Sequence, residues 1–262
     1  MQRFIEVPFQ GVTIRGTVYL PQRSRRHPTV LMLHSFTGNR IETGFLFVEI
    51  GRELARRGMA AISFDFRNSG ESDGLFEDTL PTDQLADARH MNAWMRAQPF
   101  VDRQRTAMLG YSLGGLLAAC LAPDLEHGGA QVLLAPTTVE NLCRFAGGAQ
   151  GAGRVIIGPH TLHERFFDDL QTLDPLAACR ASRAATLLIQ GTADKAVPPT
   201  VAEVYREALN AAAHPPATIE MVDAADHRFS GPVARRHVVK RVAGWLEAHF
   251  AAAGDERRPP SP

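Results

Sequence analysis

Six short runs of apolar and β-branched residues alternate with helix-like segments from residue 29 onward. Continuous apolar runs of this length are typical of strands that are buried on both faces of a parallel sheet. Neighbouring parallel strands need long crossover connections, and the segments between the runs have that length. The chain therefore predicts a mostly parallel α/β sheet with helices on both faces, built on residues 29–34, 60–65, 106–109, 131–135, 186–190 and 218–222.

Two further strands are expected before this series. Residues 3–7 and 12–20 flank Gln10-Gly11, and this arrangement predicts an antiparallel hairpin. The expected sheet thus has eight strands. Gly58 and Pro99 end two helix-like segments, as such residues commonly do. The helices expected are residues 42–57, 82–97, 113–121, 202–212 and 232–250.

One interval is too long for a simple connection. About fifty residues separate positions 135 and 186, roughly twice what a connection with one helix needs. We expect a short cap insertion at about residues 137–180, within one domain that covers residues 1–253. The Pro- and Arg-rich end, residues 254–262, predicts a disordered tail.

Composition excludes several classes of protein. Of 262 residues, 45% are hydrophobic and 21% are charged, which is typical of a globular chain rather than a disordered one. Lys and Arg number 28, as do Asp and Glu, so the net charge of zero supplies no field for nucleic acid or an anionic membrane. We expect a small-molecule partner, with a homodimer left open.

Cysteine usage and the start of the chain bear on location. Cys120, Cys143 and Cys179 are odd in number and not closely spaced, so a disulfide scaffold is not expected. Residues 1–8 lack the apolar stretch of a signal peptide, and no window is apolar enough to span a membrane. These features predict a cytoplasmic protein.

The third apolar run leads into Gly110-Tyr111-Ser112-Leu113-Gly114-Gly115, and a helix-like run follows. Gly-x-Ser-x-Gly between a strand and a helix is a nucleophile elbow, a sharp turn that exposes the serine hydroxyl. Side chains at Gly110 and Gly114 would collide where strand and helix nearly touch. Ser112 is therefore the candidate nucleophile.

A serine hydroxyl needs an imidazole to take its proton and a carboxylate to orient that imidazole. Asp194 lies just after the fifth apolar run, and His227 follows the sixth. Carboxyl ends of parallel strands meet at one edge of the sheet, so both side chains are placed to meet Ser112. Asp226 is the alternative acid, but consecutive residues in an extended loop point apart, which favours Asp194.

Other histidines lack this position after a strand. Two of them form His160-x-x-His163-Glu164, which superficially suggests a metal pair, but neither the order nor a third ligand of a zinc site accompanies it. We therefore expect no metal and no cofactor. The histidines weighed against His227 are His160 and His163 in the cap, His214 in a linker, and His237 and His249 in the terminal helix.

The attacked carbonyl becomes an oxyanion, which needs two preorganised donors. The backbone N–H of Leu113 comes with the elbow. A second donor is expected from the loop after the first parallel strand, His34-Ser35-Phe36-Thr37-Gly38-Asn39, where the Phe36 N–H is the natural candidate. We expect His34 to brace this loop rather than to act as a second base.

With these features placed, residues 3–250 resemble an α/β hydrolase. The chain is similar in particular to the bacterial cinnamoyl (feruloyl) esterases and to the serine aminopeptidase-like and lysophospholipase-like hydrolases around them. The supporting segments are residues 34–39, 64–74, 110–115, 191–194 and 225–229. Ser35 stands where that family usually has glycine. The phenolic-ester branch also uses a cap tyrosine to hold the phenol hydroxyl, whereas the tyrosines here are Tyr19, Tyr111 and Tyr205.

We therefore expect a serine carboxylic-ester hydrolase without a cofactor, working through an acyl-enzyme on small or medium acyl or aryl esters. The apolar cap residues expected to contact substrate are Phe145, Phe166, Phe167 and Leu170. Three alternatives stay open. An aminopeptidase-like amide hydrolase would need carboxylates to grip an α-amino group, a feruloyl esterase in the strict sense would need a phenol grip, and a binding protein would have lost the chemistry. The carboxylates available in the cap are Glu164, Asp168 and Asp169.

Overall fold

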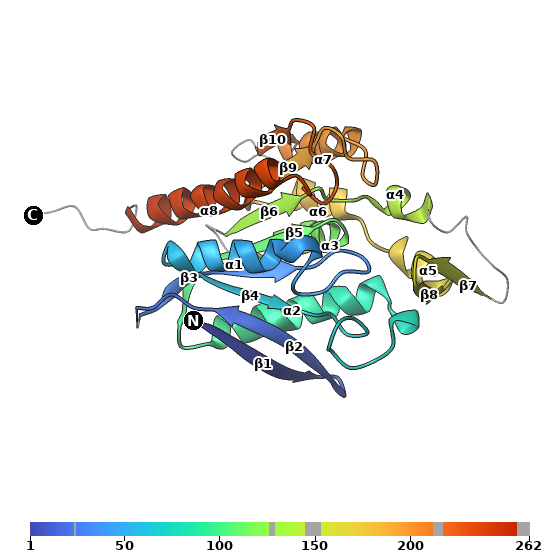
Figure 1. The fold of residues 1–262 in the computed structure, drawn as a ribbon, viewed down its shortest axis with the longest axis horizontal. Coiled ribbons are helices and arrows are strands. Elements are labelled where there is room, and N and C mark those ends of the chain that lie inside the picture. The colour runs from blue at the N-terminus through green and yellow to red at the C-terminus, as the bar shows by residue number, and fades with distance from the viewer. Residues whose placement is uncertain (24, 126–128, 145–152, 212–216, 256–262) are drawn as a thin grey trace, which may run out of the picture.

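The central sheet of the computed structural model has eight strands in the order β1-β2-β4-β3-β5-β6-β9-β10 (Figure 1). The first two strands run antiparallel and the other six run parallel. The predicted α/β class and all eight predicted strands are confirmed. The strands are β1 (Gln2–Phe9), β2 (Val12–Tyr19), β3 (His27–Leu33), β4 (Ala60–Phe64), β5 (Val101–Tyr111), β6 (Ala130–Leu134), β9 (Ala185–Gly191) and β10 (Thr218–Val222).

The structure describes residues 1–23, 25–125, 129–144, 153–211 and 217–255. Among these residues, no helix is both long and apolar enough to cross a membrane. Helix α8 extends to Asp255, two residues into the segment predicted as a tail, and residues 256–262 lie outside the described part.

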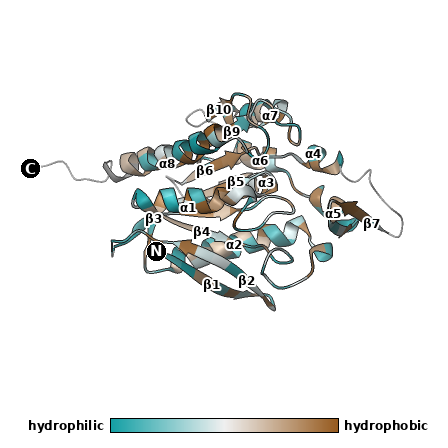
Figure 2. Ribbon diagram, viewed as in Figure 1, coloured by the Kyte–Doolittle hydropathy of each residue, from teal (hydrophilic) through white to brown (hydrophobic). Residues whose placement is uncertain are grey.

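Helices cover both faces of the sheet and bury two hydrophobic cores. Helices α1 (Leu46–Arg56) and α8 (Pro232–Asp255) contact each other on one face. The other face carries α2 (Pro81–Ala97), α3 (Leu113–Leu121), α6 (Pro175–Ala181) and α7 (Thr200–Asn210). Alternate side chains of β3 point to opposite faces. Val30 and Met32 belong to the core beneath α1 and α8, whereas Leu31 and Leu33 belong to the core beneath α2 and α3. Figure 2 shows the hydrophobic colour concentrated in the central strands.

The long interval between β6 and β9 contains a small separate hairpin. Strands β7 (Arg154–Ile157) and β8 (His160–His163) pair antiparallel beside the main sheet (Figure 1), and in the sequence they lie between α4 (Val139–Cys143) and α5 (Arg165–Leu170). Helix α6 also falls in this interval, and it packs against α3 and α7. Within the described residues, segments 139–144 and 153–170 of this interval contribute Asn141, Leu142 and Ile157 to the surroundings of Ser112 and His227.

One predicted helix is interrupted at its start. Residues 42–57 were expected to form a single helix, but a short 3-10 turn, η1 (Thr43–Phe45), precedes α1. Glu42, Gly44 and Phe45 have positive φ angles of 62°, 63° and 64°, which no helix accommodates. The chain thus makes a tight bend before α1, close to the carboxyl end of β3.

Candidate active site

Ser112 occupies the strained turn between β5 and α3, with φ 54° and ψ −114°. The glycines beside it are required sterically. A Cβ on Gly110 would lie 2.0 Å from the carbonyl oxygen of Gly114, and one on Gly114 would lie 2.1 Å from that of Leu33. Only glycine lets β5, α3 and β3 approach so closely. The crowding expected from the sequence is present, and the turn presents Ser112 at the carboxyl end of the sheet.

The structure brings the three predicted residues into one hydrogen-bonded chain. His227 Nε2 lies 3.1 Å from Ser112 Oγ, and His227 Nδ1 lies 2.7 Å from Asp194 Oδ2. The side chain of Asp194 is fully buried, and that of His227 is 18% exposed. With Nδ1–H donating to the carboxylate, Nε2 is left as an acceptor for the serine proton. This arrangement can activate a hydroxyl.

Four donors fix the Asp194 carboxylate. Its Oδ1 accepts hydrogen bonds from the backbone N–H groups of Ala196 (2.9 Å) and Val197 (2.8 Å). Its Oδ2 accepts from His227 and from Gln190 Nε2, at 2.9 Å. Sequence reasoning missed Gln190, which lies in β9 four residues before the aspartate; its position at the end of an apolar strand was the available signal. The carboxylate has one orientation, directed at the imidazole.

Asp226, the alternative acid, is directed elsewhere. Its carboxylate accepts hydrogen bonds from the backbone N–H of Ser230 at 2.7 Å and from the Ser230 hydroxyl at 2.6 Å. These bonds cap the turn that leads toward α8. Asp226 therefore makes no hydrogen bond to the His227 ring.

Tyr111, next to the serine in the motif, contacts the histidine loop. Its hydroxyl donates to the backbone carbonyl of His227 at 2.9 Å, and the two rings lie 5.2 Å apart. Burial, together with the carboxylates of Glu42 and Asp194, raises the pKa of Tyr111 well above its ordinary value. The hydroxyl therefore stays protonated and keeps donating. Sequence reasoning gave this residue no role, although it lies inside the motif.

Two backbone N–H groups flank the serine without acceptors among the described residues, those of Phe36 and Leu113. Leu113 is the first residue of α3, where an amide has no partner within the helix. Phe36 lies in the loop after β3, and it lines the same cavity as Ser112. Both positions suit donors that wait for a developing negative charge.

His34 braces the loop that carries Phe36. Its Nδ1 lies 2.8 Å from the carbonyl of Ser35, and its Nε2 accepts from the backbone N–H of Phe66 at 3.1 Å. Burial lowers the pKa of His34, so the ring stays neutral. The Ser35 N–H donates to Glu42 at 2.5 Å, which fixes the loop from its other side. As expected from the sequence, His34 has a supporting position and does not face the serine.

A cavity of about 220 Å³ opens in front of Ser112 and His227. Drug-sized ligands usually occupy about 300–1,000 Å³, so this space suits a small group. The cap contributes Leu142 and Ile157 to its wall. The other lining residues are Ser35, Phe36, Thr37, Gly38, Thr43, Tyr111, Thr137, Asn141, Ala196, Val197 and Arg228.

Of the four cap residues predicted to contact substrate, the three that the structure describes do not line this cavity. Phe166 and Leu170 are fully buried and Phe167 is 5% exposed, because all three pack into the core beneath the cap. The Phe166 ring lies 5.0 Å from that of Phe36, so it packs against the loop that carries Phe36. Phe145 lies outside the described residues. Sequence reasoning recognised apolar cap positions but chose those that face inward.

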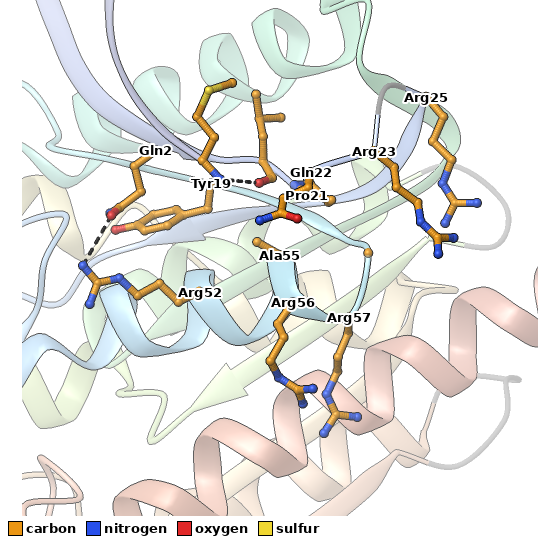
Figure 3. Close-up of a pocket in the computed structure, with 13 residues that line it drawn as sticks. Gln2, Tyr19, Pro21, Gln22, Arg23, Arg25, Arg52, Ala55, Arg56 and Arg57 are labelled. Atoms are coloured by element: carbon orange, nitrogen blue, oxygen red, sulfur yellow. Dashed lines mark hydrogen bonds between the residues drawn. The ribbon is translucent and has the colours of Figure 1, made fainter.

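A larger hollow of about 690 Å³ lies far from Ser112, beside the carboxyl end of α1 and the loop after β2. Figure 3 shows its arginine side chains, with Arg52 bonded to Gln2. Its described lining contains no serine, histidine or carboxylate, so it lacks the parts of a Ser-His-Asp site. Elsewhere in the described part of the chain, no three His, Cys, Asp or Glu residues are grouped to hold a metal ion.

Comparisons with known proteins identify a family and a fold for this chain. A profile described as the prolyl oligopeptidase family matches residues 52–253. A solved structure of Est1E from Butyrivibrio proteoclasticus with ferulic acid has a TM-score of 0.82 and 19% identity, covering 94% of this chain and 99% of that one. The esterase domain of a Rhodothermus marinus protein has a TM-score of 0.73 and 21% identity, with coverages of 95% and 98%. These structures are α/β hydrolases, and the likeness establishes the fold.

Curated relatives match over shorter segments. An uncharacterized 31.7 kDa protein of the traX-finO intergenic region in Escherichia coli is 33% identical over 106 residues, which is 40% of this chain and 35% of that protein. The chain therefore matches well under two thirds of the length of this relative.

Proposed function

The chain belongs to the prolyl oligopeptidase family and has the α/β-hydrolase fold, and from this premise we propose that it is a serine hydrolase of small and medium carboxylic esters. One observation carries the proposal. Ser112, His227 and Asp194 form a continuous hydrogen-bonded chain, and Ser112 and His227 open into the same cavity as the Phe36 loop.

Acylation comes first in the proposed mechanism. Ser112 Oγ attacks the ester carbonyl carbon while His227 Nε2 takes the hydroxyl proton, and Asp194 stabilises the resulting imidazolium. The carbonyl oxygen becomes negative and accepts hydrogen bonds from the Phe36 and Leu113 N–H groups. The carbon–oxygen bond to the alcohol then breaks as His227 returns its proton to the leaving oxygen. The products are an alcohol and an acyl-Ser112 ester.

Deacylation repeats these steps with water. His227 takes a proton from a water molecule, whose oxygen attacks the acyl carbon, and the same two N–H groups hold the oxyanion. Collapse returns the proton to Ser112 Oγ and releases a carboxylic acid. No group besides the residues named and water is required for the atoms and charges to balance.

The cavity supports small acyl or aryl groups as substrates. Its volume of about 220 Å³ is below the usual range for a drug-sized ligand. Leu142 and Ile157 supply an apolar wall, and such a wall discriminates by only about 1–3 kcal/mol per methylene. Broad selectivity among short esters follows.

Peptide or amide cleavage is the second candidate, because the family profile is named for an oligopeptidase. An aminopeptidase would need a carboxylate in the cavity to hold an α-amino group. Glu164, Asp168 and Asp169 do not line it, and the Asp169 carboxylate instead accepts from the N–H and hydroxyl of Thr82 at 2.8 and 2.6 Å. This placement favours esters over aminoacyl amides.

A strict feruloyl esterase is less well supported. The structure of Est1E was solved with ferulic acid, but likeness at 19% identity concerns the fold. Tyr19 and Tyr205 are buried away from the cavity, and the Tyr111 hydroxyl already donates to His227. The described cap therefore presents no tyrosine to a phenol.

A substrate panel tests the proposal. Purified protein is assayed with p-nitrophenyl esters from acetate to laurate, methyl ferulate and aminoacyl p-nitroanilides. We expect the highest kcat/KM on a short or medium alkyl or aryl ester and a steep decline by laurate. A kcat/KM on an aminoacyl anilide above that on every ester would replace the proposal with the peptidase alternative.

A further inference from the structure

Arg235, in the first turn of α8, is a buried cation without a buried counter-charge. It is 8% exposed, and its guanidinium forms no ion pair with a carboxylate in the described part of the chain. Burying a charge is costly unless its hydrogen-bonding capacity is used. Its neighbour Arg236 is exposed. The chain thus buries one of two adjacent arginines, and the bonds of Arg235 indicate why.

The guanidinium joins two loops through four backbone carbonyls. Nε donates to Phe229 at 3.1 Å and Nη2 donates to Arg228 at 3.0 Å, both in the loop that follows His227. Nη1 donates to Thr43 at 3.0 Å and to Gly44 at 2.9 Å, in the bend before α1. One side chain therefore holds two segments that are almost two hundred residues apart in the sequence.

Neither loop can satisfy these carbonyls by regular structure. The bend before α1 has three residues with positive φ, and Phe229 has φ 47°. Backbone in such conformations forms no helix or strand ladder, and it persists only where its surroundings hold it. On the other side of the histidine, the Tyr111 hydroxyl binds the carbonyl of residue 227. Side-chain donors thus hold three consecutive carbonyls, those of residues 227, 228 and 229.

The bend is also connected to the oxyanion loop. Glu42 Oε2 accepts from the Thr43 N–H at 3.2 Å, while its Oε1 accepts from the Ser35 N–H at 2.5 Å. Ser35 directly precedes Phe36. The contacts therefore run from Arg235 through Thr43 and Glu42 to the loop whose N–H is the proposed oxyanion donor.

We propose that Arg235 is a positioning residue that sets the separation between the base and the oxyanion donor. It touches no reacting atom, and the inference rests on the proposed function. The guanidinium holds the His227 loop and the bend before α1 at a fixed separation. It thereby keeps the imidazole and the Phe36 N–H at the correct positions relative to Ser112. Displacement of a reacting group by about 1 Å costs on the order of 10²-fold in rate.

A planar guanidinium suits this task better than an ammonium. Its five N–H donors form a rigid fork, so it reaches carbonyls on both loops at once. A lysine at this position has three donors at one point, which can serve one loop but not both. Arg235→Lys keeps the positive charge but loses the hydrogen bonds to one of the two loops. This variant therefore separates the effect of the charge from the effect of joining the loops.

The test compares Arg235→Met and Arg235→Lys with Arg236→Met, a matched change of the exposed neighbour. Each protein is labelled with a fluorophosphonate to count reactive sites, and kcat is expressed per labelled site alongside KM for a short p-nitrophenyl ester. Circular dichroism fixes a temperature at which every variant is folded. If the wild-type serine does not label, the proposed function fails, whatever Arg235 does.

We expect Arg235→Met to lower kcat per site and the labelling rate by about 10- to 100-fold with KM within threefold, since the loss concerns geometry and not binding. Arg235→Lys should recover part of this loss, and Arg236→Met should match the wild type. Wild-type kcat per labelled site in Arg235→Met, with labelling equally fast, would overturn the positioning role. If the methionine variant fails to fold, Arg235→Lys decides: a fall of at least threefold is expected, and an unchanged kcat overturns the inference.

Discussion

At the scale of single residues, the carboxylates of Asp194 and Asp226 have different hydrogen-bond partners. The Asp194 carboxylate accepts from His227, Gln190 and two backbone N–H groups, whereas that of Asp226 accepts from the N–H and hydroxyl of Ser230. A carboxylate that orients an imidazole fixes its tautomer and stabilises its cation, and a carboxylate that caps a turn does neither. The proximity of Asp226 to His227 in sequence is therefore no guide to its role.

The two aspartates give a direct comparison. Asp194→Asn should lower kcat by about 10⁴-fold, because the amide imposes the wrong tautomer and removes the counter-charge. Asp226→Asn should stay within about threefold, as exposed substitutions usually change little. Both variants are assayed on one short p-nitrophenyl ester. The opposite order of effects would assign the acid role to Asp226.

We predict that His34 makes the free energy of unfolding depend on pH. Burial lowers its pKa below the ordinary value of 6.5, against the opposing effect of Glu42. Below that value the unfolded chain takes up a proton that the folded chain refuses, so the free energy of unfolding falls as pH falls. The loss begins near pH 6.5, continues down to the folded pKa, and has a slope of at most about 1.4 kcal/mol per pH unit.

Urea unfolding of the wild type and of His34→Gln between pH 5 and 8 measures this dependence. The difference in unfolding free energy isolates His34, because all other titrating groups are shared. The unfolding free energy of the wild type minus that of the variant should be constant above about pH 7 and should decrease toward pH 5. An advantage that grows toward acid would show that the folded protein binds the proton more tightly than the unfolded chain does.

At the scale of elements, the cap separates into residues that face the cavity and residues that hold the cap in place. Leu142 in α4 and Ile157 in β7 line the cavity. Phe166 and Leu170 in α5 are buried in the core instead. A sequence pattern shows that all four are apolar, but it does not show which side of a short helix or hairpin meets the cavity. That choice depends on how the cap folds over the sheet.

Changes in the cap should therefore have two distinct effects. Leu142→Ala enlarges the cavity and should raise the ratio of kcat/KM on octanoate to that on acetate by about tenfold. The discrimination of an apolar wall between substrates has an upper limit of about 3 kcal/mol per methylene. Phe166→Ala should leave this ratio within about threefold while destabilising the fold by about 3–5 kcal/mol. The ratio is measured with p-nitrophenyl esters, and stability by urea unfolding. A change of chain-length preference in Phe166→Ala alone would mean that this ring contacts substrate.

Element ends differ from the sequence prediction where contacts with distant elements decide them. Strand β5 begins at Val101 rather than at residue 106, because His27 of β3 pairs with Val101 although polar residues follow it. The bend before α1 delays the start of a predicted helix from residue 42 to residue 46, and Arg235 of α8 bonds to this bend. Local pattern predicts each element, but it carries no information about a partner almost two hundred residues away.

At the scale of the whole molecule, the parallel sheet gathers the candidate site. Ser112 follows β5, Asp194 follows β9 and His227 follows β10, so all three lie at the carboxyl ends of the strands. This rule, together with the Gly-x-Ser-x-Gly motif, made the candidate residues predictable from the sequence. The rule does not supply distances or the bonds from Gln190, Tyr111 and Arg235, because these depend on tertiary packing.

The reactivity of one serine is the measurement that tests the central claim most directly. Wild-type protein and Ser112→Ala are treated with a fluorophosphonate, the adducts are located by peptide mass spectrometry, and ester turnover is measured on the same samples. We predict a single adduct on Ser112, no adduct in the variant, and turnover lower by on the order of 10⁶-fold in a variant that unfolds like the wild type. An adduct on another residue, or more than a few per cent of wild-type turnover in Ser112→Ala, would contradict the account.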